Sequence, residues 1–227
     1  MTKNKNISNP LLILTIVFIS SCVSTWNFII PKDLKSSIKY CYNGERTGLD
    51  SIIDIHGYYS MTFPFDRWEI KEEKYVKDTG TVNFIFYPNG LFLYQLHNYG
   101  ENLSDYLKRI AYNQNKKETR DFYRYFWWGN YIVKKDTIKT YNYDPPGTSS
   151  WTGSEIWYLI NADKTLSEIY TSPIGYETLE EREMYREKRR ENIMKMSKAK
   201  FYYIDSLPNP DYSWIVEAKW FRCNKNQ

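Results

Sequence analysis

Histidine, cysteine and glycine are scarce in this chain of 227 residues, and their scarcity excludes several kinds of site. Two histidines, His56 and His97, and three cysteines are present, which is too few for paired-histidine or clustered-cysteine zinc motifs. The 10 glycines form neither a phosphate-binding loop nor a Gly-x-Ser-x-Gly nucleophile motif. We therefore expect no metal, no cofactor and no catalytic residues, and we expect both histidines to be solvated.

An excess of charge of one sign is also lacking. Lys and Arg number 31 against 27 Asp and Glu. Without residues 1–21, which carry two lysines and no acidic residue, the balance is 29 to 27, a net charge of +2. Nucleic-acid binders have a much stronger basic excess, so we expect no nucleic-acid partner.

Only one long apolar run occurs, Leu11–Ile19, and it is too short to be a spanning helix, which needs about 20 apolar residues. Lys3 and Lys5 precede the run, and two serines and Cys22 follow it. A basic start, a short apolar stretch and small residues at its end are typical of a secretory signal peptide.

The end of that segment, Ile19-Ser20-Ser21-Cys22, resembles the lipobox of bacterial lipoproteins. The resemblance implies that Cys22 is acylated, becomes the first mature residue and anchors the protein to a membrane. No acidic residue occurs in 23–27, which by the same resemblance favours an outer-membrane lipoprotein facing the periplasm. The alternative is an ordinary cleaved signal with Cys22 incidental. We expect a signal peptide over 1–21, a tether over 22–31 and one domain over 32–227.

The remaining sequence is rich in aromatic residues, with 22 Tyr, 11 Phe and 8 Trp, and this composition favours β-strands. Alternating apolar residues predict a strand over 55–63 that ends at Pro64. Turn residues between apolar runs predict three hairpins and a final strand over 214–220. The hairpins span 81–97 around Pro88-Asn89-Gly90, 125–143 around Lys135-Asp136, and 154–170 around 161–164.

Three segments have helical periodicity instead. An apolar face over 32–42 includes Cys41, and a second stripe over 102–118 begins at a possible cap, Asn102. Residues 177–200 carry interleaved acidic and basic side chains, which is typical of a solvated helix.

Serial hairpins predict an all-β fold with a few peripheral helices, an antiparallel up-and-down β-barrel of eight to ten strands. Gly57-Tyr58-Tyr59 in the first strand, followed by hairpins and a late helix, resembles lipocalin-like proteins, although that family usually has tryptophan where Tyr59 stands. The resemblance implies a lipocalin-like barrel. An open β-sandwich is the structural alternative.

The two cysteines other than Cys22 lie at opposite ends of the predicted domain. In an oxidising compartment Cys41 and Cys223 can form a disulfide, and the alternative is two separate buried thiols.

Two functions fit these expectations. By strand parity, Tyr59, Met61, Tyr131, Trp214 and Trp220 point into the barrel. They favour non-catalytic binding of a small apolar or amphipathic ligand there. If the same side chains fill the interior, the protein is instead an interaction or inhibitor module of an envelope complex. A third hypothesis, an envelope hydrolase, requires carboxylates such as Asp54, Glu155 and Glu168 to converge.

Overall fold

The computed structural model describes residues 40–96, 102–113, 116–145, 153–174 and 178–223, all within one compact unit, Pro31–Gln227. Cys22, His97 and most of the helix predicted over 32–42 lie outside these ranges. Tyr40–Tyr42, the described end of that predicted helix, is not helical.

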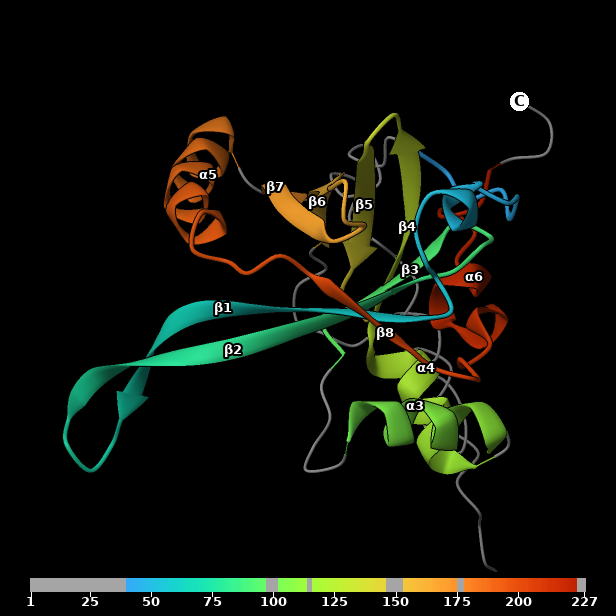
Figure 1. The fold of residues 1–227 in the computed structure, drawn as a ribbon, viewed down its shortest axis with the longest axis horizontal. Coiled ribbons are helices and arrows are strands. Elements are labelled where there is room, and N and C mark those ends of the chain that lie inside the picture. Colours follow the sequence, from blue (N-terminus) through green and yellow to red (C-terminus); the bar gives the residue numbers. More distant parts are fainter. Residues whose placement is uncertain (1–39, 97–101, 114–115, 146–152, 175–177, 224–227) are drawn as a thin grey trace, which may run out of the picture. The chain divides into compact units, whose positions relative to one another are not determined.

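Eight strands form one antiparallel sheet in the order β7-β6-β5-β4-β3-β2-β1-β8 (Figure 1). Consecutive strands are neighbours except β8, which returns to pair with β1. This topology confirms the all-β, up-and-down prediction. The strands are β1 Gly57–Glu69, β2 Lys74–Phe86, β3 Leu91–Tyr94, β4 Trp127–Lys134, β5 Thr137–Tyr143, β6 Gly153–Ile160, β7 Leu166–Ile174 and β8 Lys200–Tyr203.

The sheet curls, and in the described residues an isolated bridge connects its two edges. Leu166 at the start of β7 and Ala199 just before β8 exchange two backbone hydrogen bonds of 3.1 and 2.7 Å. Because β8 already pairs with β1, this contact joins the last strands to the first. The arrangement is a single curled, barrel-like sheet and not the two layers of a β-sandwich.

Helices lie around the sheet. Those in the described residues are α3 Leu103–Tyr112, α4 Lys117–Tyr125, α5 Leu179–Ile193 and α6 Trp214–Glu217, with short 3-10 turns at Leu49–Ser51 and Pro210–Tyr212. The predicted cap is confirmed, because the Asn102 side chain accepts a 2.9 Å hydrogen bond from the Ser104 N–H. The single helix predicted over 102–118 is two helices. Asn113 separates them, its side chain donating to the Arg109 carbonyl, a local bond that competes with helix continuation.

The prediction of a final strand over 214–220 is wrong. Trp214, Ile215 and Val216 are consecutive and all buried, so this segment is not a strand with one buried face; it is the short helix α6. The strand that completes the sheet is β8, at the end of the segment predicted as a helix over 177–200. The helix itself, α5, stops at Ile193.

β1 also runs past Pro64, where the sequence predicted its end. Thr62 directs both its N–H and its C=O to Ser197, on the side of β1 away from β2. Residues two apart on an antiparallel strand face the same side, so Pro64 also faces away from β2. Its missing N–H therefore removes no bond to β2, and the two strands stay paired as far as Glu69 and Lys74.

The disulfide between Cys41 and Cys223 is present, with the two Cα atoms 4.8 Å apart. Tyr42 and Arg222 form a parallel bridge beside it, in which the Tyr42 N–H donates to the Phe221 carbonyl (2.8 Å) and the Cys223 N–H to the Tyr42 carbonyl (2.9 Å). The alternative of two separate thiols is therefore wrong, and the two ends of the described chain are held together.

Candidate functional site

Three of the five residues predicted to line a binding site lie inside the curled sheet. Tyr59, Met61 and Tyr131 belong to its central core, and each is at most 2% exposed. The prediction is wrong for Trp214 and Trp220, because neither is on a strand. The Trp220 ring packs on Tyr143, which is five residues from the interior residue Ile138 on β5 and so lies on the outer face of the sheet.

Aromatic rings fill the middle of the interior. Phe84 is fully buried, and its ring centroid lies 4.8 Å from that of Tyr158, 5.6 Å from Phe86 and 5.9 Å from both Tyr59 and Phe92. These separations are typical of aromatic rings in direct contact. The middle of the interior is therefore packed with side chains.

Phe84→Ala is expected to lower the free energy of unfolding by about 4 kcal/mol, because truncating a buried phenylalanine removes apolar contacts and leaves a cavity. Chemical denaturation followed by circular dichroism measures the change. Tyr112→Ala, at a ring that is 74% exposed, is the matched control and should change stability by less than about 0.5 kcal/mol. Equal effects of the two substitutions would contradict a filled interior.

Some interior side chains, Asn142 and Tyr158 among them, nevertheless have unsatisfied polar atoms. Asn142 is fully buried and faces inward like Ile138, four residues earlier on β5. In the described part of the chain, neither atom of its amide has a hydrogen-bond partner, and the buried Tyr158 hydroxyl also has none. Buried polar groups usually bind protein atoms or water, so these atoms are the interior positions that a polar group of a bound molecule would satisfy.

The carboxylates weighed for hydrolysis do not converge. Glu168 pairs with the interior residue Tyr158 and is buried inside the sheet, where Arg189 of α5 lies 3.5 Å from it and Thr171 donates to it. Burial raises the pKa of Glu168. Glu155 lies on the opposite face of β6 and accepts hydrogen bonds from the Tyr141 hydroxyl and the Trp157 indole. Asp54 is exposed and outside the strands.

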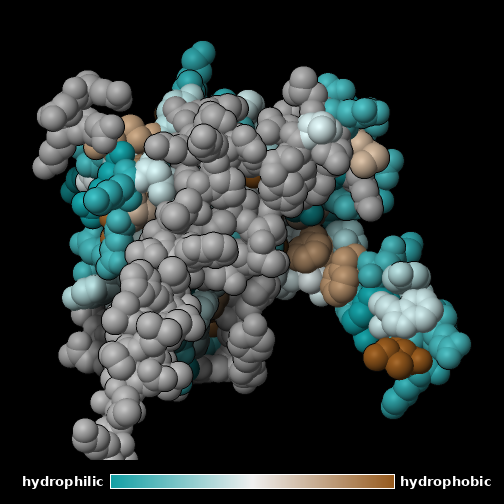
Figure 2. All heavy atoms as spheres, turned by 180° about the vertical axis from the view of Figure 1, so that it is seen from behind, coloured by the Kyte–Doolittle hydropathy of each residue, from teal (hydrophilic) through white to brown (hydrophobic). Residues whose placement is uncertain are grey.

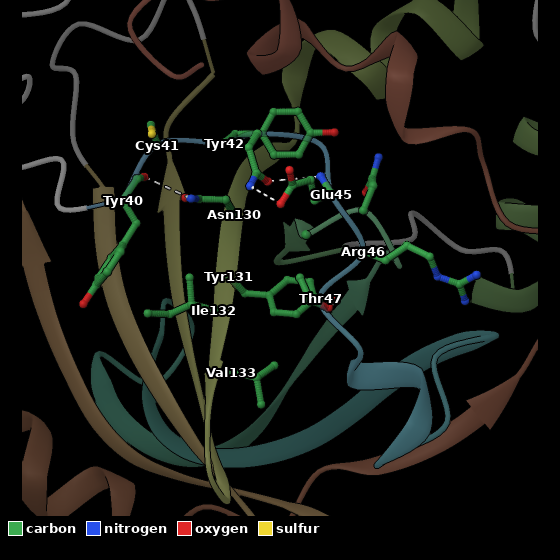
Figure 3. A pocket seen from close by; sticks show the side chains of 13 residues that line it. Tyr40, Cys41, Tyr42, Glu45, Arg46, Thr47, Asn130, Tyr131, Ile132 and Val133 are labelled. Atoms are coloured by element: carbon green, nitrogen blue, oxygen red, sulfur yellow. Dashed lines mark hydrogen bonds between the residues drawn. The ribbon is translucent and has the colours of Figure 1, made fainter. Parts of the chain in front are cut away.

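A cleft of about 400 Å³ lies between the segment 40–47 and strand β4. Figure 3 shows Tyr131 and Thr47 meeting across it, with the Asn130 side chain reaching from β4 toward Tyr40. The Thr47 and Tyr131 hydroxyl oxygens are 2.7 Å apart, and the Tyr131 hydroxyl lies 2.8 Å from the Tyr87 carbonyl oxygen. Neighbouring side chains that line the cleft are Tyr42, Asn43, Glu45, Arg46, Asn89, Ile132 and Val133.

The arm formed by residues 63–80 is the second conspicuous surface. Here β1 and β2 pair only with each other, because β8 pairs with β1 at Gly57–Ser60 and β3 pairs with β2 at Ile85 and Phe86. The arm extends away from the other strands in Figure 1. Figure 2 shows hydrophobic surface on this projection, bordered by hydrophilic side chains.

The described residues contain no group of three or more histidine, cysteine, aspartate or glutamate side chains that could hold a metal ion. His56 is exposed, as predicted. Within the same ranges, no helix is both long and apolar enough to cross a bilayer.

Comparisons with protein families, with curated proteins and with solved structures find no match to this chain. The sequence reasoning missed both the arm and the cleft. The sequence feature that could have indicated the arm is the strand-like composition, which continues on either side of the charged turn 70–73. The cleft had no local signal, because its walls come from segments that are far apart in the sequence.

Proposed function

We propose that this protein is a membrane-tethered lipoprotein, acylated at Cys22 and facing the periplasm from the outer membrane. Its domain acts as a non-catalytic interaction module, an accessory or inhibitor of an envelope complex. The supporting observation is the contrast between an interior filled with rings and an arm whose large apolar side chains are left in solvent. We propose that the arm docks on a partner protein.

The exposed side chains of the arm form an ordered set. Trp68 is 48% exposed, Tyr75 70% and Ile70, in the turn, 79%. Trp68 and Tyr75 face each other across the two strands with ring centroids 5.0 Å apart. An ordered aromatic pair beside an apolar residue is typical of the anchors that fill a pocket on a partner protein.

The backbone edges of the arm are protected against strand addition. Pro64 removes an N–H from the outer edge of β1, and on β2 the Asp78 carboxylate accepts a 2.8 Å hydrogen bond from the Thr79 N–H. Proline and charged residues on an edge are known devices against unwanted pairing. They favour docking through side chains over pairing of two copies of the arm edge to edge.

The charges of the arm favour a protein over a lipid surface. Residues 66–78 contain four basic and five acidic side chains. Binding to an anionic bilayer needs a basic excess, which this segment lacks. Mixed charges around an apolar centre match the polar rim of a protein interface.

Site-specific photocrosslinking in cells tests the docking. A benzophenone amino acid at Ile70 is expected to give an adduct with one envelope protein, and the same group at Tyr112, equally exposed on α3, is expected to give none. The double substitution Trp68→Ala and Tyr75→Ala should abolish the adduct. Adducts only with lipid or with a second copy of the chain, or the same adducts from both positions, would overturn the proposal.

Acylation at Cys22 is tested separately. Cys22→Ser is expected to abolish incorporation of radiolabelled palmitate, because no thiol then stands at the lipobox position. Equal labelling of the variant and the wild type would refute acylation at Cys22 and leave the docking proposal untouched.

A ligand carrier is the second candidate function, favoured by the unsatisfied interior atoms of Asn142 and Tyr158. Native mass spectrometry of the purified protein separates the two candidates. A filled interior predicts the mass of the protein alone, and a carrier predicts a co-purified small molecule that is lost on unfolding.

A further inference from the structure

We infer that the cleft between segment 40–47 and β4 is a binding site for a neutral saccharide. This site is separate from the arm, and the inference does not depend on the proposed docking. Four features of the cleft carry it: its rigidity, a buried amide oxygen without a partner, its balance of charge and its mixture of rings and amides.

The cleft is preorganised. Its N-terminal wall is fixed at one end by the Cys41–Cys223 disulfide and at the other by the Thr47 N–H, which donates to the Pro88 carbonyl at 3.1 Å. Between these points the Tyr42 ring stacks on Phe221 with centroids 5.3 Å apart. A wall held in this way loses little conformational freedom when a ligand binds, which favours affinity.

Asn130 supplies the polar anchor. The residue is 3% exposed, and its amide N–H donates to the Tyr40 carbonyl at 3.1 Å, which fixes the orientation of the side chain. Its amide oxygen is buried and, among the described residues, has no hydrogen-bond partner. An unsatisfied buried acceptor is unfavourable, and a hydroxyl group donated by a ligand in the cleft would satisfy it.

The charges on the cleft wall do not select an ion. Among the described residues that line it, Glu45 and Arg46 are the charged ones, and Arg46 forms an ion pair with Asp50. The Glu45 carboxylate is oriented by the Asn43 amide, which donates to it at 2.9 Å, and Asn43 accepts the Glu45 N–H at 3.0 Å. The described lining therefore offers directed hydrogen-bonding groups and one charged side chain of each sign.

A sugar ring matches this lining. One face of a pyranose presents C–H groups, which pack on apolar and aromatic surface, and its rim presents hydroxyls that both donate and accept. The cleft lining includes Tyr131 and Val133, which lie on the same face of β4, for the first, and the amides of Asn43, Asn89 and Asn130 for the second. Its volume of about 400 Å³ lies within the range of small-molecule sites.

Isothermal titration calorimetry tests the inference on the purified full-length protein, kept in a detergent without a sugar head group. The probes are cellobiose, maltose and N,N′-diacetylchitobiose, and at least one is expected to bind with a millimolar or lower dissociation constant. Asn130→Ala should weaken that binding at least fivefold, because the ligand loses its buried acceptor.

Asn43→Ala is the second variant, because Asn43 is exposed and its replacement is expected to leave the fold intact. It should weaken binding about fivefold through loss of one hydrogen bond and of the fixed Glu45 carboxylate. Asn192→Ala on α5, away from the cleft, is the matched control and should bind like the wild type. Absence of binding by all three sugars, or equal binding by Asn43→Ala and Asn192→Ala, would overturn the inference.

Discussion

Replacing Cys41 and Cys223 together by serine is expected to lower the free energy of unfolding by about 5 kcal/mol. The bond joins residues 182 positions apart in the sequence. In the chain-entropy model, closing so long a loop restricts the unfolded chain by about 5 kcal/mol at room temperature. That is a large part of the total stability of a typical domain, about 5–15 kcal/mol.

Urea denaturation with and without reducing agent measures this effect. The wild type should become less stable on reduction, and the double-serine variant should have the same midpoint under both conditions. Its midpoint should match that of the reduced wild type. A wild type that loses less than about 1 kcal/mol on reduction would contradict the chain-entropy account.

Alkaline pH is expected to unfold the protein in one steep transition. Seven buried tyrosines have a pKa raised above the ordinary value of 10.0, in each case chiefly because burial disfavours the phenolate. They are Tyr59, Tyr87, Tyr123, Tyr131, Tyr141, Tyr143 and Tyr158.

The sign follows from proton binding. The unfolded chain loses these protons near pH 10 and the folded protein keeps them, so stability is full below pH 10 and falls as the pH rises above it. Each tyrosine contributes about 1.4 kcal/mol per pH unit, so the set contributes about 10 kcal/mol per unit. The part of the phenolate absorbance that comes from these seven tyrosines should therefore change together with the circular dichroism, within a narrow pH range.

Tyr158→Phe tests how one buried tyrosine contributes to the alkaline transition. The Tyr158 hydroxyl is buried without a hydrogen-bond partner in the described structure, so phenylalanine keeps the packing and removes one titrating group. The transition should move to higher pH and become less steep. Tyr112→Phe, at an exposed ring, should leave it unchanged. Complete titration of all the tyrosines, these seven included, without loss of structure would contradict their burial.

The hairpin turns could be predicted because their chemistry is local. Gly90 has a φ of 88°, a left-handed conformation that glycine adopts without strain, and it follows Pro88-Asn89 as the sequence suggested. The turn at Lys135-Asp136 also lies where it was predicted, between β4 and β5. Each turn then fixes the pairing of its two flanking strands.

The errors arose where tertiary contacts decide the structure. A proline normally ends a strand. Only the fold, in which Thr62 binds Ser197 on the side of β1 away from β2, shows that Pro64 faces that side and interrupts no pairing with β2. The alternation of Trp214, Val216, Ala218 and Trp220 satisfies a strand pattern, and the burial of the consecutive residues 214–216 becomes evident only in the fold. β8 is four residues long and directly follows a charged helical segment, so its own sequence gives a weak signal.

The candidate site was only partly predictable for the same reason. Strand parity placed Tyr59, Met61 and Tyr131 inside the sheet correctly, since parity is a local property. It could not show whether the interior is filled, because that depends on how Phe84 and Tyr158 meet from strands far apart in the sequence.

The disulfide also determines how the protein responds to mechanical force. When the oxidised chain is stretched by its two ends, tension passes from residue 41 straight to residue 223 and bypasses the 182-residue interval between them. Roughly 640 Å of chain is thereby shielded from the load, at about 3.5 Å per extended residue. In an optical trap, the barrel should stay folded under a pull that unravels the same chain after reduction.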